Sequence, residues 1–139
     1  SVATLETLLA RPDAQSRREV ATGLASLGTP SATRLLGVAL RDANAEVAIV
    51  AARAIARSGV SGSAALLAAR LHELDLDAAD FLLAREIITG LAHTREPAAT
   101  DALAKIASRR AFIKRGHFVE IQQLVAKAQA MHAKEGVLR

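Results

Sequence analysis

The chain has 139 residues, about half of them apolar, and a formal net charge of +4. This length suits one domain with a substantial core, and the apolar content excludes intrinsic disorder. Because the chain contains no Cys, it has no disulfide, no thiol catalysis and no Cys-ligated metal, and its modest positive charge permits an acidic partner without requiring one.

The apolar residues are mostly Ala and Leu, with three Phe, no Trp and no Tyr. Ala and Leu are strong helix formers, whereas strands favour β-branched and aromatic residues, so the composition predicts an all-α fold. No run of about eighteen apolar residues occurs, and the first residues lack the basic and apolar regions of a signal peptide. We therefore expect a cytoplasmic protein. The start at Ser1 instead of Met predicts either a processed start or a chain excised from a longer one.

Turn residues divide the chain into eight segments with apolar residues at helical spacing. Pro30 and Pro97 stand where the first turn of a helix should lie, a position at which a missing N–H costs nothing. The short connections require neighbouring helices to run antiparallel. The expected helices cover residues 2–10, 15–27, 31–42, 45–57, 62–74, 78–92, 97–110 and 118–133.

An internal repeat is the most informative feature of the chain. Residues 18–36 and 85–103 are identical at ten of nineteen positions. Shorter copies at 49–59 and 119–127 align with them, which gives periods of 31, 36 and 34 residues. A period in the thirties with two helices per unit is typical of an α-solenoid. We predict one domain over residues 1–139, built from about four two-helix repeats.

Two neighbouring patterns carry a family resemblance. Glu-Val-x-x-x-Leu-Ala-x-Leu-Gly spans residues 19–28, and Thr-Pro-x-Ala-x-x-x-Leu spans residues 29–36. Both resemble the HEAT-like repeats common in bacterial proteins, including the short repeats of phycobilisome lyases. The resemblance implies a scaffold whose second helices line a concave side, and it leaves the ligand open because such folds carry many functions. The joint at residues 108–117 is longer than the family pattern.

When the second helices are aligned, three positions in each, four residues apart, lie outside the core stripe. None of the twelve holds an acid, which predicts a basic, polar surface. The alternative is a solvated face whose Arg side chains pair with Glu19, Glu86 and Glu120 of neighbouring helices. The twelve are Arg18, Thr22, Ser26, Ile49, Arg53, Arg57, Arg85, Thr89, His93, Val119, Gln123 and Lys127.

A second basic segment lies in the longer joint. It consists of Lys105, Arg109, Arg110, Lys114 and Arg115, with Phe112, Ile113 and Phe118 interleaved and no acid between Asp101 and Glu120. Arg grips carboxylate or phosphate bidentately, so this joint is a candidate docking element. The alternative is that the aromatic side chains close the end of the core and the basic ones solvate it.

Catalytic and metal-binding patterns are absent from the sequence. An acidic patch at residues 73–80 fails as a calcium loop because Asp80 stands where Gly is needed, and Asp77 is expected to cap the following helix. The four His have no metal-ligand spacing, and no phosphate loop or nucleophile turn occurs. We expect no enzyme, cofactor or metal. Catalysis by a lone carboxylate, as in helical-repeat DNA glycosylases, stays open, although those use aromatic residues that this chain lacks.

The function we predict is a non-catalytic protein-binding scaffold or adaptor that takes an acidic protein surface or peptide on its concave face. The alternative is an anion- or nucleic-acid-binding module with a basic inner face, and a pigment-lyase-like auxiliary is a third reading. The candidate binding residues are Arg18, Arg53, Arg57, Arg85, Arg109, Arg110, Lys114 and Arg115. We also expect the opening helix to pack against an earlier repeat of a longer chain or, by self-association, against a second copy, because its apolar residues Val2, Leu5, Leu8 and Leu9 follow no cap.

Overall fold

The computed structural model describes residues 2–76, 79–109 and 116–136, and the described residues form eight α-helices and no strand. The all-α solenoid predicted from the sequence is confirmed. The helices are α1 (Val2–Leu9), α2 (Ala14–Leu27), α3 (Pro30–Ala39), α4 (Ala45–Arg57), α5 (Ser63–Glu73), α6 (Phe81–Ala92), α7 (Pro97–Ala107) and α8 (Gly116–Lys134). None of the helices in the described ranges has the length and apolarity that crossing a membrane requires.

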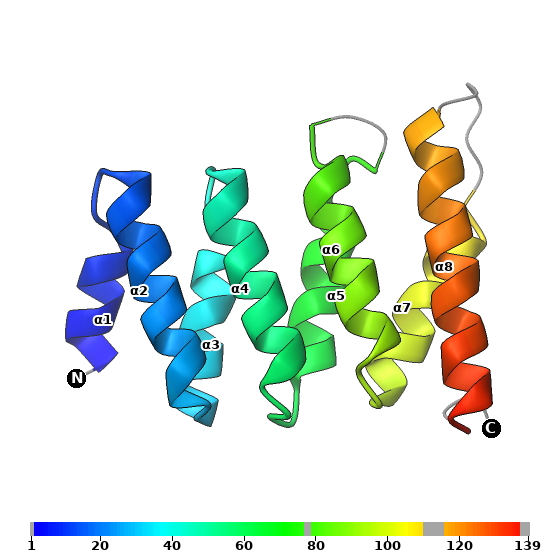
Figure 1. Cartoon of the computed structure of the whole chain (residues 1–139), viewed down its shortest axis with the longest axis horizontal. Coiled ribbons are helices and arrows are strands. Elements are labelled where there is room, and N and C mark those ends of the chain that lie inside the picture. The colour runs from blue at the N-terminus through cyan, green and yellow to red at the C-terminus, as the bar shows by residue number, and fades with distance from the viewer. Residues whose placement is uncertain (1, 77–78, 110–115, 137–139) are drawn as a thin grey trace.

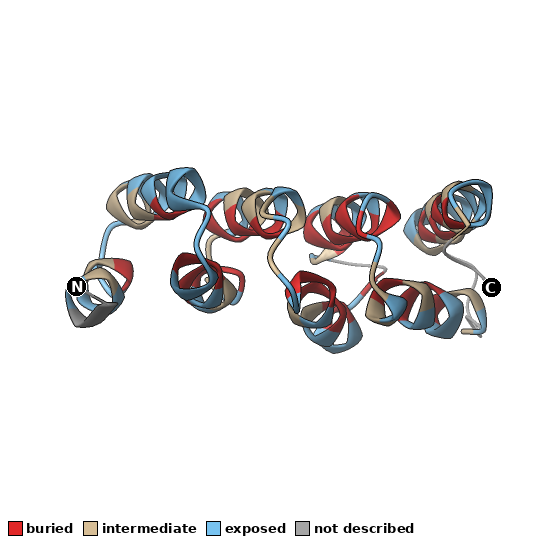
Figure 2. Ribbon diagram, turned by 90° about the horizontal axis from the view of Figure 1, so that it is seen from below, coloured by how far each residue is buried: buried red, intermediate tan, exposed pale blue. Residues whose placement is uncertain are grey.

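The helices form four hairpins that stack side by side in two rows. The first helices α1, α3, α5 and α7 make one row, and the second helices α2, α4, α6 and α8 make the other, with the two termini at opposite ends (Figure 1). Each second helix packs against the next, and each also packs against its own first helix. Both rows are nearly straight and the buried residues lie between them (Figure 2), so the concavity expected of the family is slight over four hairpins.

The helix starts follow local capping chemistry. The side chains of Asp13, Thr29 and Asn44 accept hydrogen bonds from backbone N–H groups in the first turns of α2, α3 and α4. Pro30 and Pro97 occupy the first turns of α3 and α7, as predicted. These caps satisfy N–H groups that have no partner within the helix, which is why the sequence located these starts to within a residue.

The structure corrects three predicted boundaries. Helix α6 begins at Phe81 instead of residue 78, because Ala79 and Asp80 form a turn in which the Asp80 carboxylate accepts the backbone N–H of Asp75. The expected cap Asp77 lies outside the described residues. Helices α3 and α7 end at Ala39 and Ala107, three residues earlier than expected. After α3 the backbone continues in tighter turns, with the N–H of Arg41 bonded to the Val38 carbonyl.

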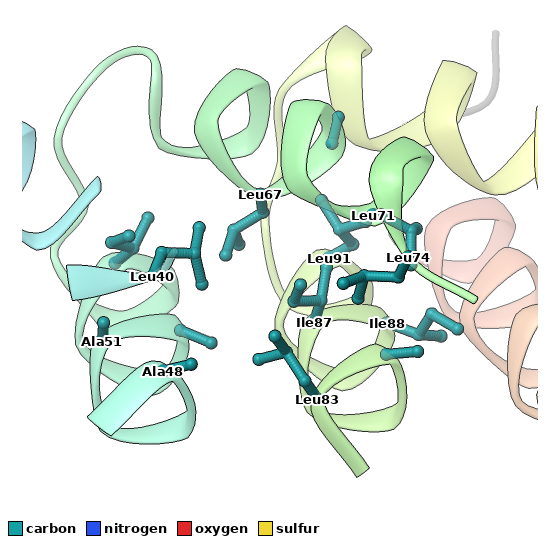
Figure 3. Close-up of a cluster of buried hydrophobic side chains, with 14 of the residues drawn as sticks. Leu40, Ala48, Ala51, Leu67, Leu71, Leu74, Leu83, Ile87, Ile88 and Leu91 are labelled. Atoms are coloured by element: carbon teal, nitrogen blue, oxygen red, sulfur yellow. The ribbon is translucent and has the colours of Figure 1, made fainter. Parts of the chain in front are cut away.

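The core is a continuous apolar layer between the two rows (Figure 3). The equivalent positions Leu24, Ile55, Leu91 and Val125 of the four second helices are at most 1% exposed, so the predicted register of these helices is confirmed. Small side chains also bring neighbouring second helices close together. A Cβ added to Gly90 of α6 would lie 2.9 Å from the Cβ of Ala56 in α4.

Candidate protein-interaction face

The twelve aligned positions of the second helices all lie on the surface, on what we call the second-helix face. Eleven are exposed, and Ile49 is half-buried. Helical periodicity explains this result, because residues four apart lie on one side of a helix and the core stripe occupies the other. The face runs across α2, α4, α6 and α8, which lie in front in Figure 1.

Two of the four candidate Arg on this face are paired with acids of the next repeat. The guanidinium of Arg53 donates to both carboxylate oxygens of Glu86, at 2.7 Å from Nε and 3.3 Å from Nη2, and this hydrogen bond raises the pKa of Arg53. Arg18 of α2 donates to Glu46 of α4 at 3.3 Å. Both Arg side chains are exposed, so neither pair contributes much to stability. Their charges are largely compensated.

The other two candidate Arg have no acidic partner among the described residues. Arg85 lies over the ring of Phe81, with its guanidinium carbon 5.7 Å from the ring centroid. Arg57 is exposed in the last turn of α4, where a cation also favours the helix dipole. Arg57 therefore carries the least compensated charge of the four.

Shallow hollows follow the second-helix face between successive helices. One hollow, of about 480 Å³, lies between α2 and α4, and its lining includes the apolar Ala25, Val50 and Ala54 together with Arg53 and Arg57. A hollow of about 290 Å³ lies between α4 and α6 and shares both Arg side chains. A third, of about 260 Å³, lies between α6 and α8. Each of these hollows has at least one apolar side chain and at least one Arg or Lys side chain in its lining.

Most hydroxyl groups on this face are already bonded within their own helices. The Oγ1 of Thr22 donates to the Arg18 carbonyl, the Oγ of Ser26 to the Gly23 carbonyl, and the Oγ1 of Thr89 to the Arg85 carbonyl. These side chains therefore present mainly their carbon atoms and lone pairs to a ligand. Selectivity for charge on this face has to come from the Arg side chains.

Two residues of the second basic segment are described, and neither belongs to a second helix. Lys105 lies in α7, in the first-helix row (Figure 1), and Arg109 follows the end of α7. Burial, and then the nearby charges of Lys105 and Arg109, lower the pKa of His72 in α5. Arg110, Lys114, Arg115, Phe112 and Ile113 lie outside the described residues, and Phe118 is half-buried. At the start of α8 the ring of His117 stacks on Phe81 with centroids 4.2 Å apart.

Contacts between repeats include groups that sequence reasoning missed. The Glu96 carboxylate accepts the backbone N–H groups of Gly62 and Ala64 at 2.9 Å and so caps α5 from the next repeat. Arg17 donates to Asp42 at 2.7 Å. His132 is fully buried, and its Nε2 donates to the Leu91 carbonyl at 2.8 Å. Glu96 and Gly62 are 34 residues apart, which equals one repeat period. An alignment of the repeats could therefore have indicated that these two residues lie side by side.

No group of three His, Asp or Glu side chains in residues 2–76, 79–109 and 116–136 is placed to hold a metal ion. Of the acids beside the second-helix face, Glu46 and Glu86 are engaged with Arg side chains, whereas Glu19 and Glu120 are exposed.

The family assignment agrees with this geometry. The family model described as HEAT repeats matches residues 2–80, which is more than half of the chain. The chain therefore belongs to the HEAT repeat family, whose members are commonly protein-interaction scaffolds and typically not enzymes. No curated protein matches the chain.

Proposed function

We infer that the protein is a non-catalytic scaffold that binds an acidic peptide, or an anionic segment of another protein, on the second-helix face. The observation that carries this proposal is the hollow of about 480 Å³ between α2 and α4, whose lining includes apolar side chains together with Arg53 and Arg57. HEAT repeats commonly mediate protein interactions, which supports a protein ligand. The assignment to a phycobilisome-lyase-type, bacterial and cytoplasmic protein stays a prediction from the sequence resemblance.

The chemistry of the hollow favours a carboxylate next to an apolar side chain. Arg57 offers planar paired donors that match a carboxylate and is weakly hydrated for a cation. Because it has no acidic partner in the described residues, a ligand does not have to displace one. Ala25, Val50 and Ala54 offer apolar surface for the neighbouring side chain of the ligand. Charge then acts mainly on the association rate, and apolar contact on the residence time.

The nucleic-acid alternative has less support on this face. Tracking a phosphate backbone requires several uncompensated cations in a row, whereas Arg18 and Arg53 are paired and Arg85 lies over Phe81. The described residues also offer no Tyr or Trp on which bases stack. Short single-stranded and duplex oligonucleotides are nevertheless the appropriate comparison ligands.

The test is selection of random peptides on the immobilised protein, followed by affinity measurement at several salt concentrations. We expect acidic peptides with a neighbouring apolar residue, and at least about tenfold weaker binding to the double variant Arg53→Glu, Arg57→Glu. Arg34→Glu is the matched control, because Arg34 is exposed on α3 in the other row. Equal peptide binding by the double variant would overturn the proposal, and tighter binding of oligonucleotides than of peptides would favour the alternative.

A further inference from the structure

The contact between α4 and α6 shows how one repeat of this chain packs against the repeat before it. Glu86 of α6 pairs with Arg53 of α4 at 2.7 Å. One turn later Gly90 lies so close to α4 that an added Cβ would be 2.9 Å from the Cβ of Ala56. One turn further, Thr94 is buried and borders a hollow shared with Ala56. The surface that contacts α4 therefore consists of Glu86 and Gly90 of α6 and Thr94 just beyond its end, four residues apart.

Helix α2 carries the same pattern of residues, and no second helix precedes it in the described chain (Figure 1). In the repeat alignment Glu19, Gly23 and Leu27 occupy the positions of Glu86, Gly90 and Thr94. Glu19 is exposed, accepts the side-chain amide of Gln15 at 3.2 Å and pairs with no cation among the described residues, and a Cβ added to Gly23 would meet no atom within 4 Å. Leu27 is 56% exposed, although its counterpart Thr94 is buried. The free end of the stack thus keeps both the close-approach glycine and the carboxylate of an inter-repeat contact.

Helix α1 contributes little to this free end. Leu9 is buried, and Leu5 and Leu8 are half-buried, so part of the apolar surface expected to drive self-association is covered within the chain. The side chain of Val2 lies outside the described ones. The exposed, interface-like surface belongs to α2.

Helix α8, at the other end, has the complementary surface. Gln123 and Ala126 occupy the positions that Arg53 and Ala56 hold in α4, with the same spacing of three residues. Both are exposed, as are Val119 and Ala130 above and below them on the same side of the helix. The buried residues Ile121, Val125, Ala128 and His132 face the opposite way, into the stack.

We propose that copies of this chain stack head to tail, with α8 of one copy packed on α2 of the next. Ala126 then lies against Gly23, the amide of Gln123 donates to the Glu19 carboxylate, and Leu27 is covered. A second copy fits this surface because its α8 supplies both the small side chain and the donor at the spacing that α4 uses toward α6. Such a contact joins two different surfaces, so it continues into longer oligomers instead of closing at a dimer.

The test is analytical ultracentrifugation of the 139-residue chain over a wide concentration range. We expect the weight-average mass to rise beyond that of a dimer. Gly23→Gln fills the space that Ala126 would occupy, and Ala126→Glu places a charge in the contact, so each should weaken association at least about tenfold. Both positions are exposed, and circular dichroism should show an unchanged helical signal. The matched control is Ala65→Glu, at an exposed alanine of α5 away from both ends.

Mixing the two variants tests which surfaces meet. Each variant retains one intact contact surface. The Ala126→Glu variant keeps the surface of α2, and the Gly23→Gln variant keeps that of α8. An equimolar mixture should therefore form a one-to-one dimer and no longer oligomer. Gln123→Arg recreates the pair seen between Arg53 and Glu86, and it should tighten association of otherwise unchanged chains about two- to fivefold at low salt. A wild-type chain that stays monomeric at millimolar concentration would overturn the proposal, and so would an oligomer that both variants leave intact. Arg53 and Arg57 are unchanged in all of these variants, so peptide binding is tested separately.

Discussion

Helices α2 and α6 carry nearly the same residues but occupy different places in the stack. Both contain Arg-Glu followed, after two residues, by Thr-Gly-Leu-Ala. Leu24 and Leu91 are equally buried, at 1% and 0% exposed, because each lies against the first helix of its own hairpin. Gly23 is exposed and Gly90 is buried, because only α6 has a second helix before it. The burial of residues that face the core thus depends on the repeat itself. The burial of residues on the side of a helix depends on whether a neighbouring repeat covers it.

The largest expected effects come from truncating the shared leucine. Leu91→Ala should lower the free energy of unfolding by about 3–5 kcal/mol, and Leu24→Ala by about 2–3 kcal/mol, because the end of the stack can collapse more easily around a cavity. Urea unfolding measures both values. Thr22→Ala, on the exposed face of α2, is the control and should change stability by less than about 0.5 kcal/mol. If Leu24→Ala and Thr22→Ala unfolded alike, the equivalence of the two helices would fail.

The next effect concerns a contact that α6 has and α2 lacks. Helix α8 reaches past the other second helices, and its buried His132 bonds to the Leu91 carbonyl and lies 3.2 Å from the Thr100 hydroxyl. His132→Ala leaves a cavity and unpaired polar groups, so it should cost about 2–4 kcal/mol. The matching change between α2 and α4 is Glu46→Gln, which removes an exposed ion pair and should cost less than about 1 kcal/mol. Thermal unfolding of the two variants compares the joints, and equal losses would contradict the asymmetry.

The shared glycine should respond with opposite signs in the two helices. Gly90→Ala forces a Cβ against that of Ala56 and should destabilise the protein by about 1–3 kcal/mol. Gly23→Ala meets open space within a helix and should stabilise it by about 0.5–1 kcal/mol, since Ala is the better helix former. The readout is the midpoint of urea unfolding at low protein concentration. A shift of the same sign in both variants would show that their surroundings do not differ as described.

The smallest expected effect is a dependence on pH at the first joint. Burial raises the pKa of Asp42, but the Arg17 hydrogen bond, the Asn44 N–H and the Arg17 charge outweigh it, so this pKa lies below its ordinary 3.8. A lowered carboxyl pKa in the folded state contributes stability above pH 3.8 that is lost as the pH falls through the folded value. Asp42→Asn should therefore lose less stability than the wild type during acid titration below pH 3.8, followed by circular dichroism. Parallel titration curves would contradict this assignment.

The sequence by itself determined the helices, the hairpin period and the inward and outward positions of each second helix. These properties follow from helical periodicity and local capping, as at Leu24, Ile55 and Asn44, so they require no knowledge of distant neighbours. The tertiary structure decided which side chains meet across repeats. It paired Arg18 with Glu46, placed Arg109 near His72 and buried His132 against Leu91. These contacts depend on how far one hairpin shifts along the next, and that shift is set by the packing of Gly90 on Ala56 and similar small residues, not by the repeat period.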